Sequence, residues 1–188
     1  NNLQTVASLL RLQGRRLPDE ASRTAIAEAG RRVATIAVVH ELLAHNPGAT
    51  VDVDVVAAKV VALTVETSMA PRAVTAVTGT FGVLPSDQAT TLALVLAELV
   101  ANAVEHGGAG QQDLAVAVAV SREGGAMSVT VTDNGPGIDL PVGEGLGLAI
   151  VGTLVRDELR GSLAFDHVDA TAPQRGTTVT VRFNPPVA

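Results

Sequence analysis

The first 45 residues carry apolar side chains in steps of three and four, the spacing of one face of an α-helix. Pro18 and Asp19 interrupt this series, and Asp19 can cap a second helix. Pro47 and Gly48 end the second series. The pattern therefore predicts a helix over residues 1 to about 16 and another from about residue 19 to residue 45. The face of the first predicted helix carries Leu3, Val6, Leu10 and Leu17, and that of the second carries Ile26, Ala29, Val33, Ile36, His40 and Leu43.

Two such helices joined by a tight turn form an antiparallel hairpin. A hairpin alone cannot bury both of its faces, so we expect a homodimer through residues 1–46 that builds a four-helix bundle. The alternative is a hairpin that packs on the C-terminal domain of its own chain. Residues 47–50 are the predicted linker, which divides the chain into a helical domain, residues 1–46, and a second domain, residues 47–188.

The second domain alternates between helical and strand-like patterns. Within residues 51–69 we expect a short strand and then a helix from about Asp54, followed by a strand within residues 71–81 that Gly82 ends. The remaining predicted elements are a helix over 86–106, strands over 114–120 and 127–132, a helix over 145–159, and strands over 162–165 and 177–183. Because helices segregate from mostly antiparallel strands, the predicted fold class is α+β, with this domain a two-layer α/β sandwich.

Composition limits the classes of function. The 188 residues are 47% apolar, enough for a core, and the net charge of −6 opposes a broad nucleic-acid footprint. The absence of cysteine excludes disulfides and cysteine-ligated zinc. No uninterrupted apolar run reaches the roughly 18 residues of a membrane-spanning helix, and no signal peptide is visible. We therefore expect a cytoplasmic segment with no membrane contact and no direct nucleic-acid contact.

Polar side chains mark one face of the predicted helix over residues 86–106. Glu98 and Asn102 are one helical turn apart, and His106 continues the same face. Asn102 offers a neutral oxygen that suits a magnesium ion shared with phosphates, and Glu98 can hold a water on that ion or act as a base. The structural alternative is a solvated polar stripe. A carboxylate on a mostly apolar surface is costly without a partner, which favours the functional interpretation.

Two glycine motifs follow. Asp133 ends a predicted strand, and Gly135 and Gly137 let the backbone turn and approach a ligand without a Cβ clash. Taken alone, Asp-Asn-Gly is also a common turn. Gly145 and Gly147 then open an apolar helix, where backbone amides and the helix dipole can bind phosphate. A lone Gly-x-Gly is weak support, and its place after the aspartate motif strengthens it.

Together, residues 98–106, 133–138 and 143–148 resemble the ATP site shared by gyrase-type topoisomerases, Hsp90 chaperones, MutL repair proteins and histidine kinases. The resemblance implies a sandwich of the Bergerat type, with ATP and Mg²⁺ as cofactors. It assigns Asp133 to the adenine amino group, and Thr177, after Gly176, to holding Asp133. Asn102 is the implied Mg²⁺ ligand, with Glu98 acting through water. The implied ATP-binding residues are Asn102, His106, Asp133, Gly135, Gly137, Ile138, Gly145, Leu146, Gly147, Leu148 and Thr177.

The N-terminal sequence narrows the family. Residues 1–13 begin Asn-Asn-Leu-Gln and resemble the dimerisation helix of the second HisKA family of sensor histidine kinases, and residues 31–43 resemble its second helix. That helix starts His-x-x-Lys-Asn-Asn-Leu-Gln, and its histidine accepts the phosphate, so the resemblance places the acceptor upstream of Asn1. It implies transfer of the γ-phosphoryl group of ATP to that histidine and on to a response regulator receiver domain, under an upstream sensor domain.

Several features complicate this interpretation. Residues 40–42, His-Glu-Leu, superficially match the more common histidine-kinase box, but an acceptor needs a partner helix after it, so we expect His40 to be a buried or partly buried structural residue. Glu105 stands where many histidine kinases have a basic residue, and the segment from Gly137 to Gly145 is short. A serine kinase of the anti-sigma type is one alternative, although it normally lacks the hairpin. A non-catalytic ATP-binding dimerisation module is another.

Overall fold

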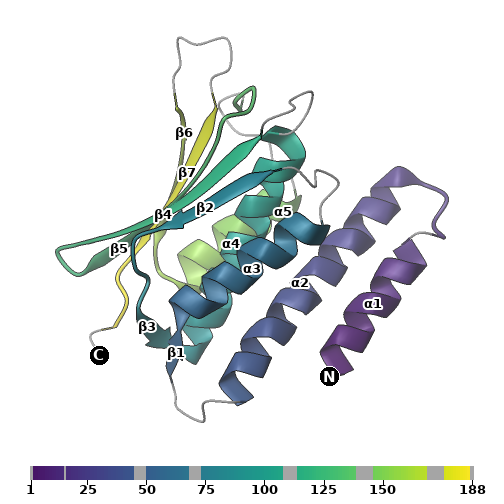
Figure 1. Cartoon of the computed structure of the whole chain (residues 1–188), viewed down its shortest axis with the longest axis horizontal. Coiled ribbons are helices and arrows are strands. Elements are labelled where there is room, and N and C mark those ends of the chain that lie inside the picture. Colours follow the sequence, from purple (N-terminus) through teal and green to yellow (C-terminus); the bar gives the residue numbers. More distant parts are fainter. Residues whose placement is uncertain are drawn as a thin grey trace.

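The computed structural model describes residues 2–14, 16–44, 50–67, 73–107, 114–138, 146–168 and 176–186. Two long helices come first and a mixed domain follows (Figure 1). In chain order the elements are α1 (Asn2–Gly14), α2 (Glu20–Ala44), β1 (Thr50–Asp52), α3 (Val53–Thr67), β2 (Val74–Thr78), β3 (Val83–Pro85), α4 (Ser86–Gly107), β4 (Ala115–Glu123), β5 (Ala126–Asp133), α5 (Leu146–Thr153), the π-helical turn η1 (Leu154–Glu158), β6 (Ser162–His167) and β7 (Thr177–Phe183).

The domain is built on a five-stranded sheet of order β2-β4-β5-β7-β6. β2 pairs with β4 in parallel, and the other pairs are antiparallel. Figure 1 shows α3, α4 and α5 together on one side of this sheet, with α2 and then α1 farther out. Along β4 and β5 the buried side chains alternate with more exposed ones, so one face of the sheet meets the helices. The prediction of an α+β fold with a two-layer sandwich is confirmed.

Helix α4 lies at the centre of the core. Leu92, Val95, Leu96 and Val100 have no exposed surface. An 18-residue window of α4 has a mean hydropathy of 1.2, so by length and composition it could cross a membrane, which a search for uninterrupted apolar runs does not reveal. In the fold 67% of that window is buried, as expected for the core helix of a globular domain, which passes the same test.

The small elements before α4 differ from the prediction. β3 was not predicted, and it pairs with β1 in a separate two-stranded sheet. Helix α3 begins at Val53, and the Asp54 carboxylate accepts hydrogen bonds from the backbone N–H groups of Phe81 (2.8 Å) and Gly82 (2.9 Å). The strand expected within residues 71–81 covers Val74–Thr78 in the described part of the chain. Gly79, whose φ is +84°, follows it directly, so the prediction that Gly82 ends this strand is wrong. Asp54 therefore ties α3 to the segment before α4.

The hairpin packs on the domain of its own chain. α1 lies along α2, and α2 contacts α3 and α4, with Val39 in the main core. The Ser22 N–H donates to the Asp19 carboxylate at 2.8 Å, which confirms the predicted cap. Hydrogen bonds from the Ser22 hydroxyl and then from its N–H lower the pKa of Asp19. His40 is exposed, so the prediction that it is buried or partly buried is wrong for the single chain. The side chains of α2 that are buried instead are those of Thr35 and Val39.

Candidate functional site

A cavity of about 540 Å³ lies beside α4, at the ends of β5 and β7. Its volume falls within the range of small-molecule sites. The apolar part of its wall includes Leu99, Val131, Phe165 and Val179. The predicted site residues that line it are Asn102, His106, Asp133, Gly137, Ile138, Gly147, Leu148 and Thr177. Residues distant in the sequence therefore meet at one concave surface.

Asp133 is the last residue of β5 and is 6% exposed. Its Oδ1 accepts a hydrogen bond from the Gly135 N–H at 2.8 Å, and Thr177 on β7 also donates to the carboxylate. Burial raises the pKa of Asp133 above its ordinary value of 3.8, against the opposing effects of these hydrogen bonds and of nearby His106. A buried carboxylate at a cavity wall is a strong acceptor for an N–H group of a ligand.

The turn after Asp133 is packed closely against the end of α4. A Cβ at Gly135 would lie 2.5 Å from the Gly107 Cα, so only glycine fits there without movement. The Gly135 carbonyl accepts a bond from the Gly176 N–H at 3.0 Å, which connects the turn to the start of β7. Gly137 has a φ of +90°, a conformation that favours glycine. These contacts fix the position of Asp133 relative to Thr177.

Asn102 lies on the α4 side of the cavity. Its Nδ2 is buried and has no hydrogen-bond partner in the described part of the chain, so the amide is available to a ligand. A Cβ at Gly147, in the first turn of α5, would lie 3.9 Å from the Asn102 Oδ1. The amide therefore faces the start of a helix, where phosphate groups bind favourably. His106 is exposed at the far end of α4 and lines the same cavity.

The donor set fits a nucleotide with magnesium. Within the described residues, no group of three or more His, Asp or Glu side chains could hold a metal ion by itself. Magnesium does not need such a group, because it keeps several waters and binds through one or two protein oxygens plus phosphates. Asn102 supplies such an oxygen, and Asp133 supplies an acceptor elsewhere on the cavity wall. A ligand that presents a nucleobase to Asp133 and a phosphate chain with its metal ion to Asn102 matches this arrangement.

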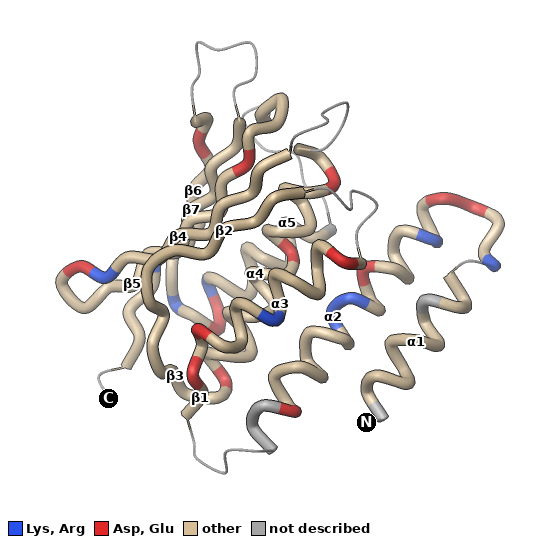
Figure 2. The backbone as a smooth tube through the Cα atoms, viewed as in Figure 1, with Lys and Arg blue, Asp and Glu red and all other residues tan. Residues whose placement is uncertain are grey.

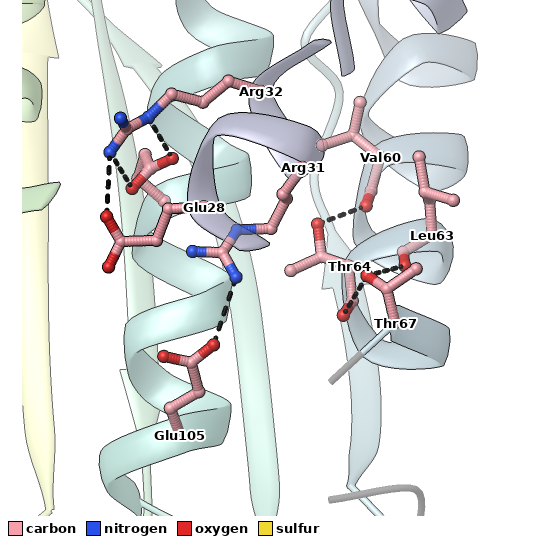
Figure 3. A network of polar contacts seen from close by, with 9 residues as sticks. Glu28, Arg31, Arg32, Val60, Leu63, Thr64, Thr67 and Glu105 are labelled. Atoms are coloured by element: carbon pink, nitrogen blue, oxygen red, sulfur yellow. Dashed lines mark hydrogen bonds and ion pairs between the residues drawn. The ribbon is translucent and has the colours of Figure 1, made fainter. Parts of the chain in front are cut away.

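Glu98 is on the predicted face of α4, but its partner is an arginine. Glu98 is 1% exposed, and both of its oxygens accept hydrogen bonds from Arg32 of α2, with Nε–Oε1 at 2.9 Å and Nη2–Oε2 at 3.2 Å. The Arg32 Nη2 also lies 3.5 Å from the Glu28 Oε2, an ion-pair distance (Figure 3). The costly buried carboxylate thus has the partner that its burial requires. Within the described chain Glu98 does not line the cavity.

Glu105 lines the cavity and is also paired with α2. Its Oε1 lies 3.1 Å from the Arg31 Nη1 (Figure 3). Figure 2 shows a basic segment on α2, the helix whose Arg31 and Arg32 pair with Glu105 and Glu98 of α4. Thr24 and Glu28 of α2 complete this wall. The contribution of α2 to this wall was not predicted, and the Arg31–Arg32 doublet was the available signal for an acidic partner.

Two predicted residues are not tested by the geometry. Gly145 lies outside the described residues. Leu146 is the first residue of α5, and the structure describes its backbone but not its side chain. Their assignment to the ATP site stays a prediction.

Two known protein families match this chain. Residues 87–187 match the family described as histidine kinase-, DNA gyrase B-, and HSP90-like ATPase, and residues 1–67 match the HisKA_2 histidine kinase family. The chain is 41% identical to the sensor histidine kinase PdtaS of Mycolicibacterium smegmatis and 39% identical to PdtaS of Mycobacterium tuberculosis. Each alignment covers 97% of this chain and 37% of the relative, so the chain spans little more than a third of these proteins.

Solved structures share the fold. The histidine kinase domain of the Erythrobacter litoralis EL346 blue-light activated histidine kinase superposes with a TM-score of 0.73 at 20% identity, covering 98% of this chain and 86% of that one. The mycobacterial sensor histidine kinase MprB gives a TM-score of 0.60 at 24% identity, covering 72% and 99%. At these identities the likeness establishes the architecture alone.

Proposed function

Because this chain belongs to the histidine kinase-, DNA gyrase B- and HSP90-like ATPase family and has a hairpin of the HisKA_2 histidine kinase type, we propose that it is the catalytic region of a two-component sensor histidine kinase. It binds Mg-ATP in the cavity beside α4. The γ-phosphoryl group is transferred to a histidine on the dimerisation helix and then to an aspartate of a response regulator. The observation that carries the proposal is the cavity itself, which both Asp133 and Asn102 line.

In this proposal Asp133 selects the base. Its carboxylate accepts a hydrogen bond from the adenine amino group, while Thr177 and the Gly135 N–H hold the carboxylate in place. Ile138 and the apolar cavity wall contact the base. Guanine presents a carbonyl where adenine has its amino group, and a carbonyl facing a carboxylate makes no hydrogen bond. The site should therefore prefer ATP to GTP.

The phosphate end of the ligand lies toward α4 and α5. The Asn102 Oδ1 is the protein ligand of Mg²⁺, and the backbone at Gly147 and Leu148 faces the phosphates at the start of α5. Bound Mg-ATP supplies the phosphoryl group and most of the charge neutralisation. The chain contributes positioning: it fixes the base at one end and the metal at the other, so that the terminal phosphate has one orientation.

The hairpin supports a homodimer through residues 1–46. Val6, Leu9 and Leu12 of α1 are 44%, 53% and 50% exposed, and Ile36 of α2 is 37% exposed. Exposed apolar side chains on paired helices fit a four-helix bundle with a second copy. The docking of α2 on its own domain leaves this surface available. We further propose that the acceptor histidine precedes Asn1 and that a sensor domain lies upstream of it. We also propose that the protein is cytoplasmic.

Two versions of the chain test this proposal. The first has the 188 residues of this sequence, and the second is extended upstream through the proposed acceptor histidine. With radiolabelled ATP and Mg²⁺, the extended chain should gain acid-labile label and the short chain should gain none. Label on His40 of the short chain would overturn the placement of the acceptor. A folded, dimeric extended chain that stays unlabelled would contradict kinase activity.

The alternatives predict other outcomes. A serine kinase of the anti-sigma type would yield acid-stable label on a partner protein, and the match of residues 1–67 to a histidine kinase family opposes it. A non-catalytic module would bind ATP without labelling any chain. The observation in its favour is Glu98, whose two oxygens both bond Arg32.

A further inference from the structure

A histidine on the edge strand β6 lies in one row with the residues that are proposed to bind the base. In the sheet, Thr177 of β7 pairs with Asp133 of β5 on one side and with His167 of β6 on the other. Side chains of directly paired residues lie on the same face of a sheet. The neighbouring row, whose three residues all line the cavity, is Val131, Val179 and Phe165. His167 is therefore on the cavity side of the sheet, at the end where Asp133 lies.

The imidazole of His167 has a buried nitrogen without a partner. Its Nδ1 is buried, and no residue in the described part of the chain forms a hydrogen bond with it. The adjacent carboxylate of Asp166 is used by the backbone, because it accepts the His167 N–H at 2.8 Å, and Asp166 is on the exposed face of β6. A buried polar atom without a partner costs free energy, so it requires a ligand or an ordered water that supplies the missing bond.

The other N–H and O–H groups around the Asp133 carboxylate are already engaged. The Gly135 N–H donates to it at 2.8 Å, and the hydroxyl and N–H of Thr177 donate to it as well. The Gly176 N–H donates to the Gly135 carbonyl at 3.0 Å. A threonine hydroxyl has only one proton, but its oxygen keeps a lone pair that can accept a further bond. Among the described residues of this row, His167 thus holds the donor that is still available, and Thr177 holds an acceptor.

We propose that His167 is a second residue that recognises adenine, and that it binds the ring nitrogen N1 through one water molecule. N1 is a hydrogen-bond acceptor and adjoins the carbon that carries the amino group. It lies on the side of the base away from the sugar, so it faces away from the phosphate end at α4 and α5. The proposal rests on the function proposed above, because it takes adenine to be the base beside Asp133.

A water is required because His167 does not line the cavity within the described chain, whereas Thr177 does. The water accepts a bond from the His167 Nδ1–H, and it donates one proton to N1 and the other to the Thr177 hydroxyl oxygen. A neutral imidazole carries its proton on one nitrogen only, so this contact selects the Nδ1–H tautomer of His167.

Two substitutions of His167 separate the hydrogen bond from the space that the ring fills. His167→Phe keeps a ring and removes both nitrogens, so the calorimetric dissociation constant for Mg-ATP should rise by about fivefold, the value of one neutral hydrogen bond. His167→Asn places its amide N–H near the position of Nδ1 and should restore most of the affinity. His40→Phe makes the same exchange at an exposed position of α2 and should leave the affinity unchanged.

Analogues of ATP identify the ligand atom. 1-deaza-ATP has a C–H group in place of N1, so it should bind the parent about fivefold more weakly than ATP does, and it should bind the parent and His167→Phe equally. 7-deaza-ATP keeps N1 and lacks N7, the acceptor on the other side of the amino group. With this analogue His167→Phe should still bind about fivefold more weakly than the parent. A purely structural role of His167 would weaken the binding of all three nucleotides by the same factor.

The tautomer gives a measurement that needs no substitution in the measured protein. In ¹⁵N NMR of the histidine-labelled parent, binding of Mg-ATP should place the His167 proton on Nδ1, and binding of 1-deaza-ATP with Mg²⁺ should not. The spectrum of His167→Asn assigns the signal by its absence. This measurement decides the question where His167→Phe fails to fold.

The outcomes separate this contact from the function on which it rests. No binding of Mg-ATP by the folded parent overturns both proposals. Equal ATP affinity of the parent and His167→Phe, or a loss that is the same for ATP and 1-deaza-ATP, overturns the contact and leaves the proposed function intact. A loss with ATP and 7-deaza-ATP but not with 1-deaza-ATP, together with the Nδ1–H tautomer, supports the contact. An Nε2–H tautomer in the ATP complex contradicts it, whatever the affinities.

Discussion

Replacing Asp133 with asparagine should weaken ATP binding and stabilise the ligand-free domain. Asparagine is nearly isosteric, and its Oδ1 can still accept the 2.8 Å hydrogen bond from the Gly135 N–H. What is lost is the negative charge opposite the adenine amino group, together with one carboxylate oxygen as an acceptor for Thr177 and the base. Hydrogen bonds to a charged acceptor contribute about 1.5–3 kcal/mol and neutral ones about 1 kcal/mol, so the difference of about 0.5–2 kcal/mol weakens binding by about twofold to thirtyfold.

The effect on stability has the opposite sign. Burial raises the pKa of Asp133 above 3.8, which means that the folded chain binds a proton more tightly than the unfolded chain. The free energy of unfolding therefore falls as the pH rises through the interval between these two pKa values. The asparagine side chain of the variant does not titrate. The free energy of unfolding of Asp133→Asn, relative to that of the parent, should therefore rise as the pH increases above 3.8 and level off once Asp133 of the folded parent is ionised.

Calorimetry with ATP and GTP, and thermal unfolding across a pH series, measure the two effects. Asp157→Asn removes the same charge from an exposed position on η1 and serves as the control. In the parent, ATP should bind more tightly than GTP, and Asp133→Asn should reduce this preference. Unchanged ATP affinity in Asp133→Asn, or equal affinity of the parent for both nucleotides, would refute the adenine contact.

Three further substitutions test other parts of the account. Asn102→Ala should abolish the magnesium dependence of ATP binding in calorimetry with and without chelator, and a retained dependence would assign the metal elsewhere. Gly135→Ala places a Cβ 2.5 Å from the Gly107 Cα, so it should lower the melting temperature and weaken ATP binding, and a fully stable variant would disprove the tight packing. Asp54→Ala leaves the Phe81 and Gly82 N–H groups without their acceptor and should cost about 2–3 kcal/mol in urea unfolding; a loss below about 0.5 kcal/mol would contradict that role.

Local patterns predicted much of the site. The position of Asp133 follows from strand alternation and from the two glycines after it, and the shared face of Glu98 and Asn102 follows from helical spacing. These features depend on residues close in the sequence. The short strand β3 was missed, because three residues carry little periodicity and its partner β1 lies some thirty residues earlier.

The partners of α4 could not be predicted in this way. Arg32 and Glu98 are 66 residues apart, and Arg31 and Glu105 are 74 apart, so their pairing depends on how α2 docks. Periodicity identified an apolar face of α2 but not which surface it would meet. For that reason His40 was expected inside and lies outside, while Val39 joins the core.

The most direct test of the account is a crystal structure of this chain with Mg²⁺ and a non-hydrolysable ATP analogue. The account predicts the adenine amino group within hydrogen-bond distance of the Asp133 carboxylate, and Mg²⁺ bound to the Asn102 Oδ1 and to phosphate oxygens. A nucleotide bound outside the cavity beside α4, or inside it without contact to Asp133 and Asn102, would contradict the account.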